Sequence, residues 1–141
     1  MKIYFCGSIR GGRDLAALYG RAVETLKEYG SVLTEHVGSS ALTHFGGDGT
    51  NEFIYQRDTA RLRECDILIA ECTVPSLGVG YEIAYGEALG KPVHIFYGGE
   101  DPRRLSAMLA GDPALHIHYY QGEAELLQQI KEIFSQEKQA G

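Results

Sequence analysis

The chain has 141 residues, 44% of them hydrophobic, and a formal net charge of −6 at pH 7. This length is sufficient for one hydrophobic core, so we predict a single domain over residues 1–141. The negative charge argues against a partner that is a nucleic acid polymer, because binding to such a polymer depends on clustered Lys and Arg.

The three cysteines and the absence of long apolar runs indicate the cellular setting. Cys6, Cys65 and Cys72 lie in or beside apolar runs without metal-ligand spacing, so we predict reduced core residues, with a reactive thiol at Cys6 or Cys72 as the alternative. No apolar stretch approaches the roughly 20 residues that span a bilayer, and no signal-peptide pattern is present. We expect a soluble, cytoplasmic protein, or a nuclear one in a eukaryote, with no membrane partner.

Five strand-like apolar runs alternate with helix-like segments. The runs are 2–8, 31–37, 66–72, 92–98 and 115–121, and the helical segments begin near Asp14, Asn51, Val79, Arg103 and Glu123. This alternation predicts an α/β fold, a doubly wound (Rossmann-like or flavodoxin-like) five-stranded parallel sheet flanked by helices. The stretch 38–50 predicts a mobile loop, either a lid over the strand ends or a plain surface excursion, and a polar tail is expected from about residue 136.

The loop after the first strand, CGSIRGGR at 6–13, combines features of an anion site. Ligands of such sheets bind outside the carboxyl ends of the strands. Gly7 permits close approach of the backbone, Ser8 offers a hydroxyl, Arg10 carries a fork of donors, and the first N–H groups of the next helix are unpaired. The loop therefore predicts a site for a small phosphate.

The loop after the third strand, TVPSLGVGYE at 73–82, ends in a carboxylate. The spacing predicts that Glu82 lies in the first helical turn, where the helix dipole favours its ionised form. Glu82 is therefore a candidate nucleophile, with simple capping of the helix as the alternative. Gly78 and Gly80 permit close approach, and the Ser76 hydroxyl is suitable for contact with an anion.

Asp58 lies inside a predicted helix. In one interpretation, Asp58 is exposed on the helix surface and forms an ion pair with Arg57 or Arg61. If the helix directs Asp58 toward Glu82, the two carboxyls form the pair that N-glycoside cleavage needs, one attacking the anomeric carbon and the other assisting the departing base. Tyr4 is either a core residue or a group that orients a carboxylate. The five histidines lack metal-ligand spacing, so we predict no metal.

Together these motifs resemble the 2′-deoxynucleoside 5′-phosphate N-hydrolases, relatives of the nucleoside 2-deoxyribosyltransferases. The resemblance lies in YFCGSIRGGR (4–13), LTEHV (33–37), the QRD segment ending at residue 58, PSLGVGYE (75–82) and LSAM (105–108). It implies hydrolysis of a 2′-deoxynucleoside 5′-monophosphate to free base and 2-deoxyribose 5-phosphate, without a cofactor. Glu82 would be the nucleophile that forms a covalent glycosyl intermediate, Asp58 would assist the departing base, and Tyr4 would position Glu82.

The same resemblance implies how substrate is held. The 5′-phosphate would be bound by Ser8, Arg10, Ser76 and Ser106, the last donated by the other subunit of a homodimer. The substrate-binding loops would include Gly7, Ile9, Gly78, Gly80 and Met108. Three alternatives stay open: a nucleoside 2-deoxyribosyltransferase, a ribonucleotide (CMP-type) N-glycosidase, and a non-catalytic nucleotide-binding module on the same fold.

Overall fold

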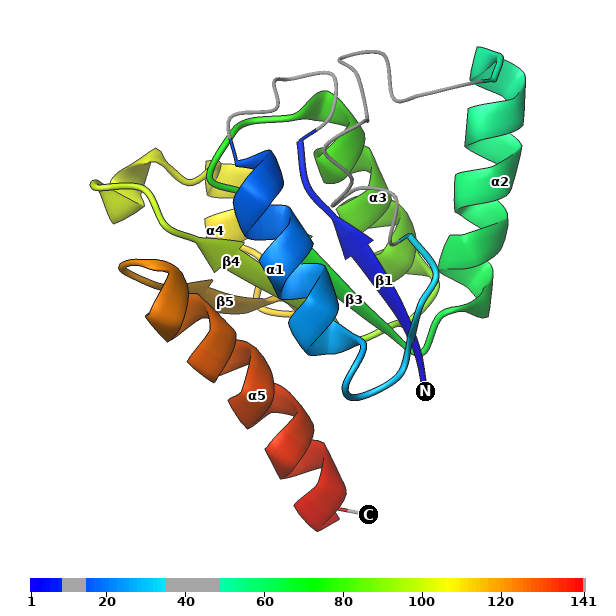
Figure 1. Ribbon diagram of the computed structural model, residues 1–141. Coiled ribbons are helices and arrows are strands. Elements are labelled where there is room, and N and C mark those ends of the chain that lie inside the picture. The colour runs from blue at the N-terminus through cyan, green and yellow to red at the C-terminus, as the bar shows by residue number, and fades with distance from the viewer. Residues whose placement is uncertain (9–14, 35–48, 141) are drawn as a thin grey trace.

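The computed structural model describes residues 1–8, 15–34 and 49–140, and its strands form one parallel sheet (Figure 1). The strands lie in the order β2–β1–β3–β4–β5, the order of flavodoxin-like folds. Their bounds are β1 Lys2–Cys6, β2 Ser31–Val32, β3 Ile67–Glu71, β4 Val93–Tyr97 and β5 His116–Tyr119. The predicted α/β fold with a five-stranded parallel sheet is therefore confirmed.

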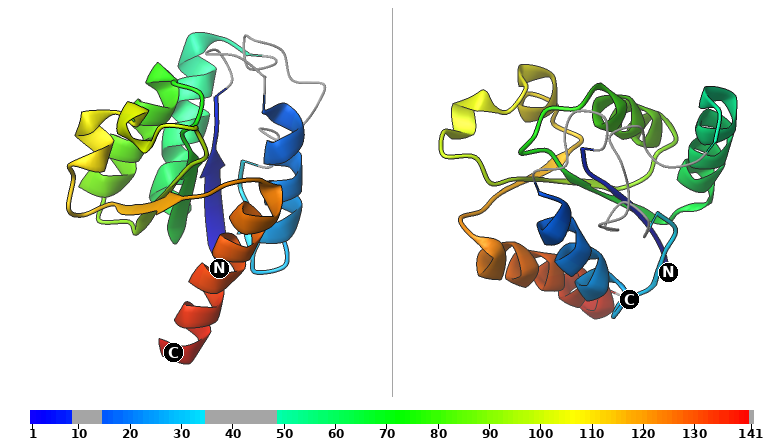
Figure 2. Two further views of the ribbon diagram at one scale, coloured as in Figure 1. Left: turned by 90° about the vertical axis from the view of Figure 1, so that its left-hand side faces the viewer. Right: turned by 45° about the horizontal axis from the view of Figure 1, so that its top comes forward.

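Helices cover both faces of the sheet (Figure 2). Helices α1 and α5 pack on one face, and α2, α3 and α4 lie on the other. Their bounds are α1 Ala16–Leu26, α2 Asn51–Glu64, α3 Leu77–Ala88, the 3-10 helix η2 Pro102–Arg104, α4 Ala107–Ala110 and α5 Glu123–Ala140. Every residue of β3 is buried, as its nearly continuous hydrophobicity predicted.

The helical segments that follow β4 and β5 differ from the sequence prediction. The single helix expected from near Arg103 is wrong, because two short helices, η2 and α4, are separated by Leu105 in an extended conformation (φ −61°, ψ 136°). Pro102 starts η2, and Ser106 starts α4 through a side-chain cap. Helix α5 continues to Ala140, so the polar residues from about 136 extend the helix.

The alternation of side chains along β1 separates two hydrophobic cores. Ile3 and Phe5 face α1 and α5, whereas Tyr4 and Cys6 face α2 and α3.

All three cysteines are buried and free, as predicted. Burial raises the pKa of the Cys72 thiol to about 12 and that of Cys6 well above its usual range, which argues against a reactive thiol. No helix within the described ranges is long and apolar enough to cross a bilayer.

The topology places one crevice between the loops that follow β1 and β3. The chain moves from β1 to β2 on one side and then returns to place β3 on the other side of β1. The direction of winding therefore reverses between β1 and β3, and ligands of such sheets bind at this reversal. Both loops singled out in the sequence begin here.

Candidate active site

A hydrogen bond between Tyr4 and Glu82 lies at the centre of the site. Tyr4 is a fully buried residue of β1, and its hydroxyl donates to Oε2 of Glu82 on α3. Tyr4 is therefore both a core residue and a group that orients a carboxylate. The other oxygen, Oε1, accepts no hydrogen bond from the residues that the structure describes.

The start of α3 corrects the prediction for Glu82. Ser76 is the N-cap, and its Oγ accepts from the backbone N–H of Val79 at 3.3 Å. The helix begins at Leu77, so Glu82 lies in the second turn and not in the first. Both the capping alternative and the argument from the helix dipole at Glu82 are therefore wrong, because the dipole effect fades within the first turn.

Glycines keep the surroundings of Glu82 open. A Cβ atom added to Gly78 would lie 4.0 Å from Oε1 of Glu82, so the carboxylate points back along α3 toward Gly78. A Cβ atom on Gly80 would meet nothing within 4 Å. Because residue 78 is glycine, no side chain at this position covers Oε1 of Glu82.

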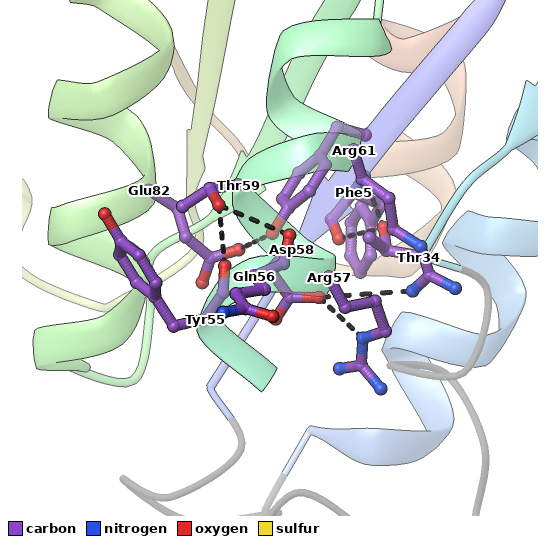
Figure 3. A network of polar contacts seen from close by, with 10 residues as sticks. Phe5, Thr34, Tyr55, Gln56, Arg57, Asp58, Thr59, Arg61 and Glu82 are labelled. Atoms are coloured by element: carbon purple, nitrogen blue, oxygen red, sulfur yellow. Dashed lines mark hydrogen bonds and ion pairs between the residues drawn. The ribbon is translucent and has the colours of Figure 1, made fainter. Parts of the chain in front are cut away.

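Asp58 projects from α2 into the same group of side chains (Figure 3). Its Oδ1 accepts from Nε of Arg57 at 2.9 Å and lies 4.0 Å from Nη1 of Arg61. The predicted ion pairs are therefore present, and the charge of Asp58 also acts on Glu82, whose pKa it raises. Both arginines engage Oδ1, and no described residue hydrogen-bonds Oδ2.

Burial and charge shift the acidity of the central pair. Burial, together with the negative charge of Asp58, raises the pKa of Glu82 from 4.5 to about 7, while the hydrogen bond from Tyr4 and the charge of Arg57 act to lower it. Burial and the charges of Glu82 and Asp58 raise the pKa of Tyr4, so its hydroxyl keeps its proton. A carboxylate with a pKa near neutrality beside a fixed donor is a common arrangement in enzyme active sites.

The predicted phosphate-binding residues divide into described and undescribed ones. Ser8 is buried after β1, and its backbone N–H donates to the Tyr19 hydroxyl at 3.1 Å. A Cβ atom on Gly7 would lie 2.8 Å from the Tyr19 ring, so the loop needs glycine there. Ile9 and Arg10 lie outside the described residues, as does the predicted mobile loop between 38 and 48.

Ser106 and Met108 lie at the start of α4. The Ser106 hydroxyl caps α4 by accepting from the N–H of Met108 at 3.3 Å. Within the described ranges, Ser106 makes no hydrogen bond to Tyr4, Asp58 or Glu82. Ser106 is exposed, and Met108 is 84% exposed.

Two polar groups had no signal in the sequence. Glu71 is only 1% exposed although it ends a hydrophobic strand, and only the fold reveals its partners. His94, His116 and His118 stack across β4 and β5, with Nδ1 of His94 2.9 Å from Nε2 of His118. No group of three or more metal-ligating side chains in the described part of the chain could hold a metal ion.

A buried tyrosine and two carboxylates lie at the switch point of a flavodoxin-like sheet, where such sheets bind their ligands. Comparison with known proteins identifies the family. The model of the nucleoside 2-deoxyribosyltransferase family matches residues 3–137. The chain belongs to this family.

Relatives within the family carry more specific names. A Mus musculus protein named 5-hydroxymethyl-dUMP N-hydrolase is 51% identical over 111 residues, which cover 77% of this chain and 64% of the mouse protein. A Tetraodon nigroviridis protein of the same name is 45% identical over 144 residues, covering 98% of this chain and 100% of the relative. The CMP N-glycosidase of Clostridium botulinum has a similar fold, with a TM-score of 0.67 at 19% identity over 93% of this chain and 98% of that chain.

Proposed function

We propose that this protein hydrolyses the N-glycosidic bond of 2′-deoxynucleoside 5′-monophosphates to give free base and 2-deoxyribose 5-phosphate. The hydrogen bond from Tyr4 to Glu82, with Asp58 beside it, is the observation that carries the proposal. Relatives named 5-hydroxymethyl-dUMP N-hydrolase support this reaction and make 5-hydroxymethyl-dUMP the first substrate to test.

The geometry supports a two-step reaction with a covalent intermediate. Tyr4 occupies Oε2 of Glu82, which leaves Oε1 to attack the anomeric carbon. As the C–O bond forms, the C–N bond breaks and its electron pair leaves with the base, which Asp58 assists through Oδ2. Water then attacks the anomeric carbon, the C–O bond to Glu82 breaks and Glu82 leaves as a carboxylate. The proton that the water loses balances the proton that the departing base gains, with Asp58 as the carrier, and 2-deoxyribose 5-phosphate departs. No step requires a cofactor.

Phosphate binding positions the sugar in this proposal. Ser8, Arg10 and Ser76 would hold the 5′-phosphate from the loops after β1 and β3. The fixed phosphate would place the anomeric carbon over Glu82, so that binding energy remote from the reacting bond serves catalysis.

A homodimer would complete the site with Ser106 of the second subunit. Large apolar side chains on the α2, α3 and α4 side of the sheet are exposed, among them Leu77 at 97% and Met108 at 84%. If these side chains form one continuous surface, that surface would favour a protein–protein contact. Ser106 is exposed beside Met108 and is available to a neighbouring subunit.

The buried, free cysteines agree with a reducing compartment such as the cytoplasm.

Product analysis tests the proposal. The purified, metal-free protein is incubated with deoxy- and ribonucleoside monophosphates, the matching nucleosides and 5-hydroxymethyl-dUMP, and released base is measured by chromatography. Release from the deoxynucleoside monophosphates alone, lost in Glu82→Ala, supports the proposal. Release from ribonucleotides indicates a CMP-type enzyme, and formation of a new nucleoside from added base indicates a transferase. Binding without release from any substrate indicates a non-catalytic module.

A further inference from the structure

Glu71 is a buried carboxylate that the proposed reaction does not use. It is the last residue of β3, and only 1% of its surface is exposed. It faces the α1 and α5 side of the sheet, because Ile67 and Ile69 of the same strand belong to that core. Glu71 therefore lies on the opposite face of the sheet from Tyr4 and Glu82. Burying a carboxyl group is unfavourable unless its hydrogen bonds compensate, so its partners indicate what it does.

The partners of Glu71 connect the ends of three strands. Its Oε1 accepts from the Thr73 hydroxyl, from the Thr73 backbone N–H at 3.1 Å and from the Tyr120 hydroxyl at 3.2 Å. The Thr73 hydroxyl in turn accepts from the backbone N–H of Gly98, which follows β4, at 2.8 Å. Tyr120 follows β5, and a Cβ atom on Gly98 would lie 2.4 Å from the Tyr120 ring.

The second oxygen of Glu71 is unusual. Oε2 is buried and has no hydrogen-bond partner among the described residues. Burial raises the pKa of Glu71, and the bonds from Thr73 and Tyr120 act to lower it. A buried group that is only half satisfied is costly, since an unmade hydrogen bond in the interior is not replaced by water. The hydrogen bonds that Oε1 accepts from Thr73 compensate in part for the unpaired Oε2.

Thr73 leads directly into the candidate active site. Only Val74 and Pro75 separate it from Ser76, whose hydroxyl caps α3. Glu82 is the sixth residue of that helix. The segment 73–76 is consequently fixed at one end by Glu71 and at the other by the cap on Val79. A shift of Thr73 would move Ser76, the predicted phosphate ligand, before it moved Tyr4 or Asp58, which lie on other elements.

We propose that Glu71 is a positioning residue that, by holding Thr73, places Ser76 and the start of α3 to receive the 5′-phosphate of the substrate. This inference rests on the proposed function. Glu71 does not touch the reacting atoms, and its effect reaches substrate through segment 73–76.

Three variants separate positioning from simple stabilisation. Thr73→Val keeps the shape of the side chain but removes the hydroxyl that joins Glu71 to Gly98. Thr73→Ser retains the hydroxyl and is the conservative rescue. Tyr120→Phe is the matched control, because it removes a hydrogen bond to the same oxygen of Glu71 and leaves both Thr73 donors to that oxygen in place.

Steady-state kinetics with a deoxynucleoside monophosphate and its matching nucleoside provide the first readout. We expect Thr73→Val to raise KM for the monophosphate about tenfold, the effect of losing one hydrogen bond to a charged group, with a less than about threefold change for the nucleoside. Thr73→Ser and Tyr120→Phe should keep the KM of the wild type. Equal KM values in Thr73→Val and Tyr120→Phe, with only their melting temperatures lowered, would overturn the proposal.

Hydrogen exchange at the Val79 amide gives a readout that does not depend on activity. This amide donates to the Ser76 cap, so its protection reports the start of α3. We expect faster exchange in Thr73→Val and wild-type exchange in Thr73→Ser and Tyr120→Phe. If the wild type releases no base from any nucleotide, the proposed function fails while the exchange comparison still tests the positioning. Unchanged exchange in Thr73→Val would refute the role of Glu71.

Discussion

Replacing Tyr4 with Phe isolates the hydrogen bond that sets the acidity of Glu82. Tyr4 is fully buried, and Phe fills the same volume while removing only the hydroxyl. The bond from that hydroxyl acts to lower the pKa of Glu82, which burial and the charge of Asp58 raise to about 7. Without the hydroxyl, the pKa of Glu82 should rise further, and the nucleophilic carboxylate should form only at higher pH.

The size of the effect follows from the strength of the bond. A hydrogen bond to a charged group is worth about 1.5–3 kcal/mol, and one pKa unit corresponds to about 1.4 kcal/mol, so the pKa of Glu82 should rise by about one to two pH units. At pH 7 the ionised fraction of Glu82 then falls from about one half to about 1–10%. We expect kcat/KM at pH 7 to fall about 5- to 50-fold from this cause alone.

The assay is the dependence of kcat/KM on pH for a deoxynucleoside monophosphate. The acid limb of the profile, where activity rises with ionisation of Glu82, should move to higher pH in Tyr4→Phe and recover much of its activity above the new pKa. If Tyr4→Phe also disturbs the orientation of Glu82, the maximal kcat/KM falls but the pH of the acid limb stays the same. The pH at which the acid limb lies is therefore the decisive readout. An acid limb that coincides with the wild type, or moves to lower pH, would refute the reasoning.

Three further predictions follow from the same site. The pKa of Glu82 rises from 4.5 to about 7 on folding, so ionised Glu82 destabilises the folded protein increasingly as the pH rises between these values. Glu82→Gln should therefore raise the free energy of unfolding at pH 8 by up to about 3 kcal/mol and leave it unchanged below pH 4.5, as urea unfolding would show. Asp58→Asn should lower kcat about 100-fold and move the acid limb to lower pH, whereas Arg57→Met should move that limb to higher pH. Met108→Glu should dissociate the proposed dimer in light scattering, and Ser106→Ala should leave the dimer intact but raise KM for nucleotides.

The sequence predicted the fold because its signals are local. The apolar run 66–72 has the continuous hydrophobicity of a strand covered on both faces, and β3 is fully buried. The alternation of strands and helices was sufficient for the parallel sheet, and glycine-rich loops marked the crevice. The start of α3 was placed two residues late because the glycines at 78 and 80 obscured the helix, whereas the cap at Ser76 determines where it begins.

Features that depend on packing between distant segments were beyond sequence reasoning. Helix α2 is polar on much of its surface, so its sequence does not show that the charge of Asp58 acts on Glu82 while Arg57 holds its Oδ1. Glu71 ends a hydrophobic strand, and its partner Tyr120 is 49 residues away along the chain. These contacts exist only after the sheet and its helices have assembled.

The half-buried position of Glu82 beside Asp58 has opposite consequences in the free protein and in the proposed transition state. In the free protein, burial raises the pKa of Glu82, and the neighbouring charge of Asp58 raises it further, so the pair is held in an unfavourable arrangement. As the glycosidic bond breaks, positive charge develops on the sugar between these groups, and in a poorly hydrated site its attraction to both carboxylates is stronger than in water. The repulsion between the two carboxylates in the free protein is therefore reduced in the transition state. An interaction that is more favourable in the transition state than in the ground state raises the rate of the chemical step rather than the affinity for substrate.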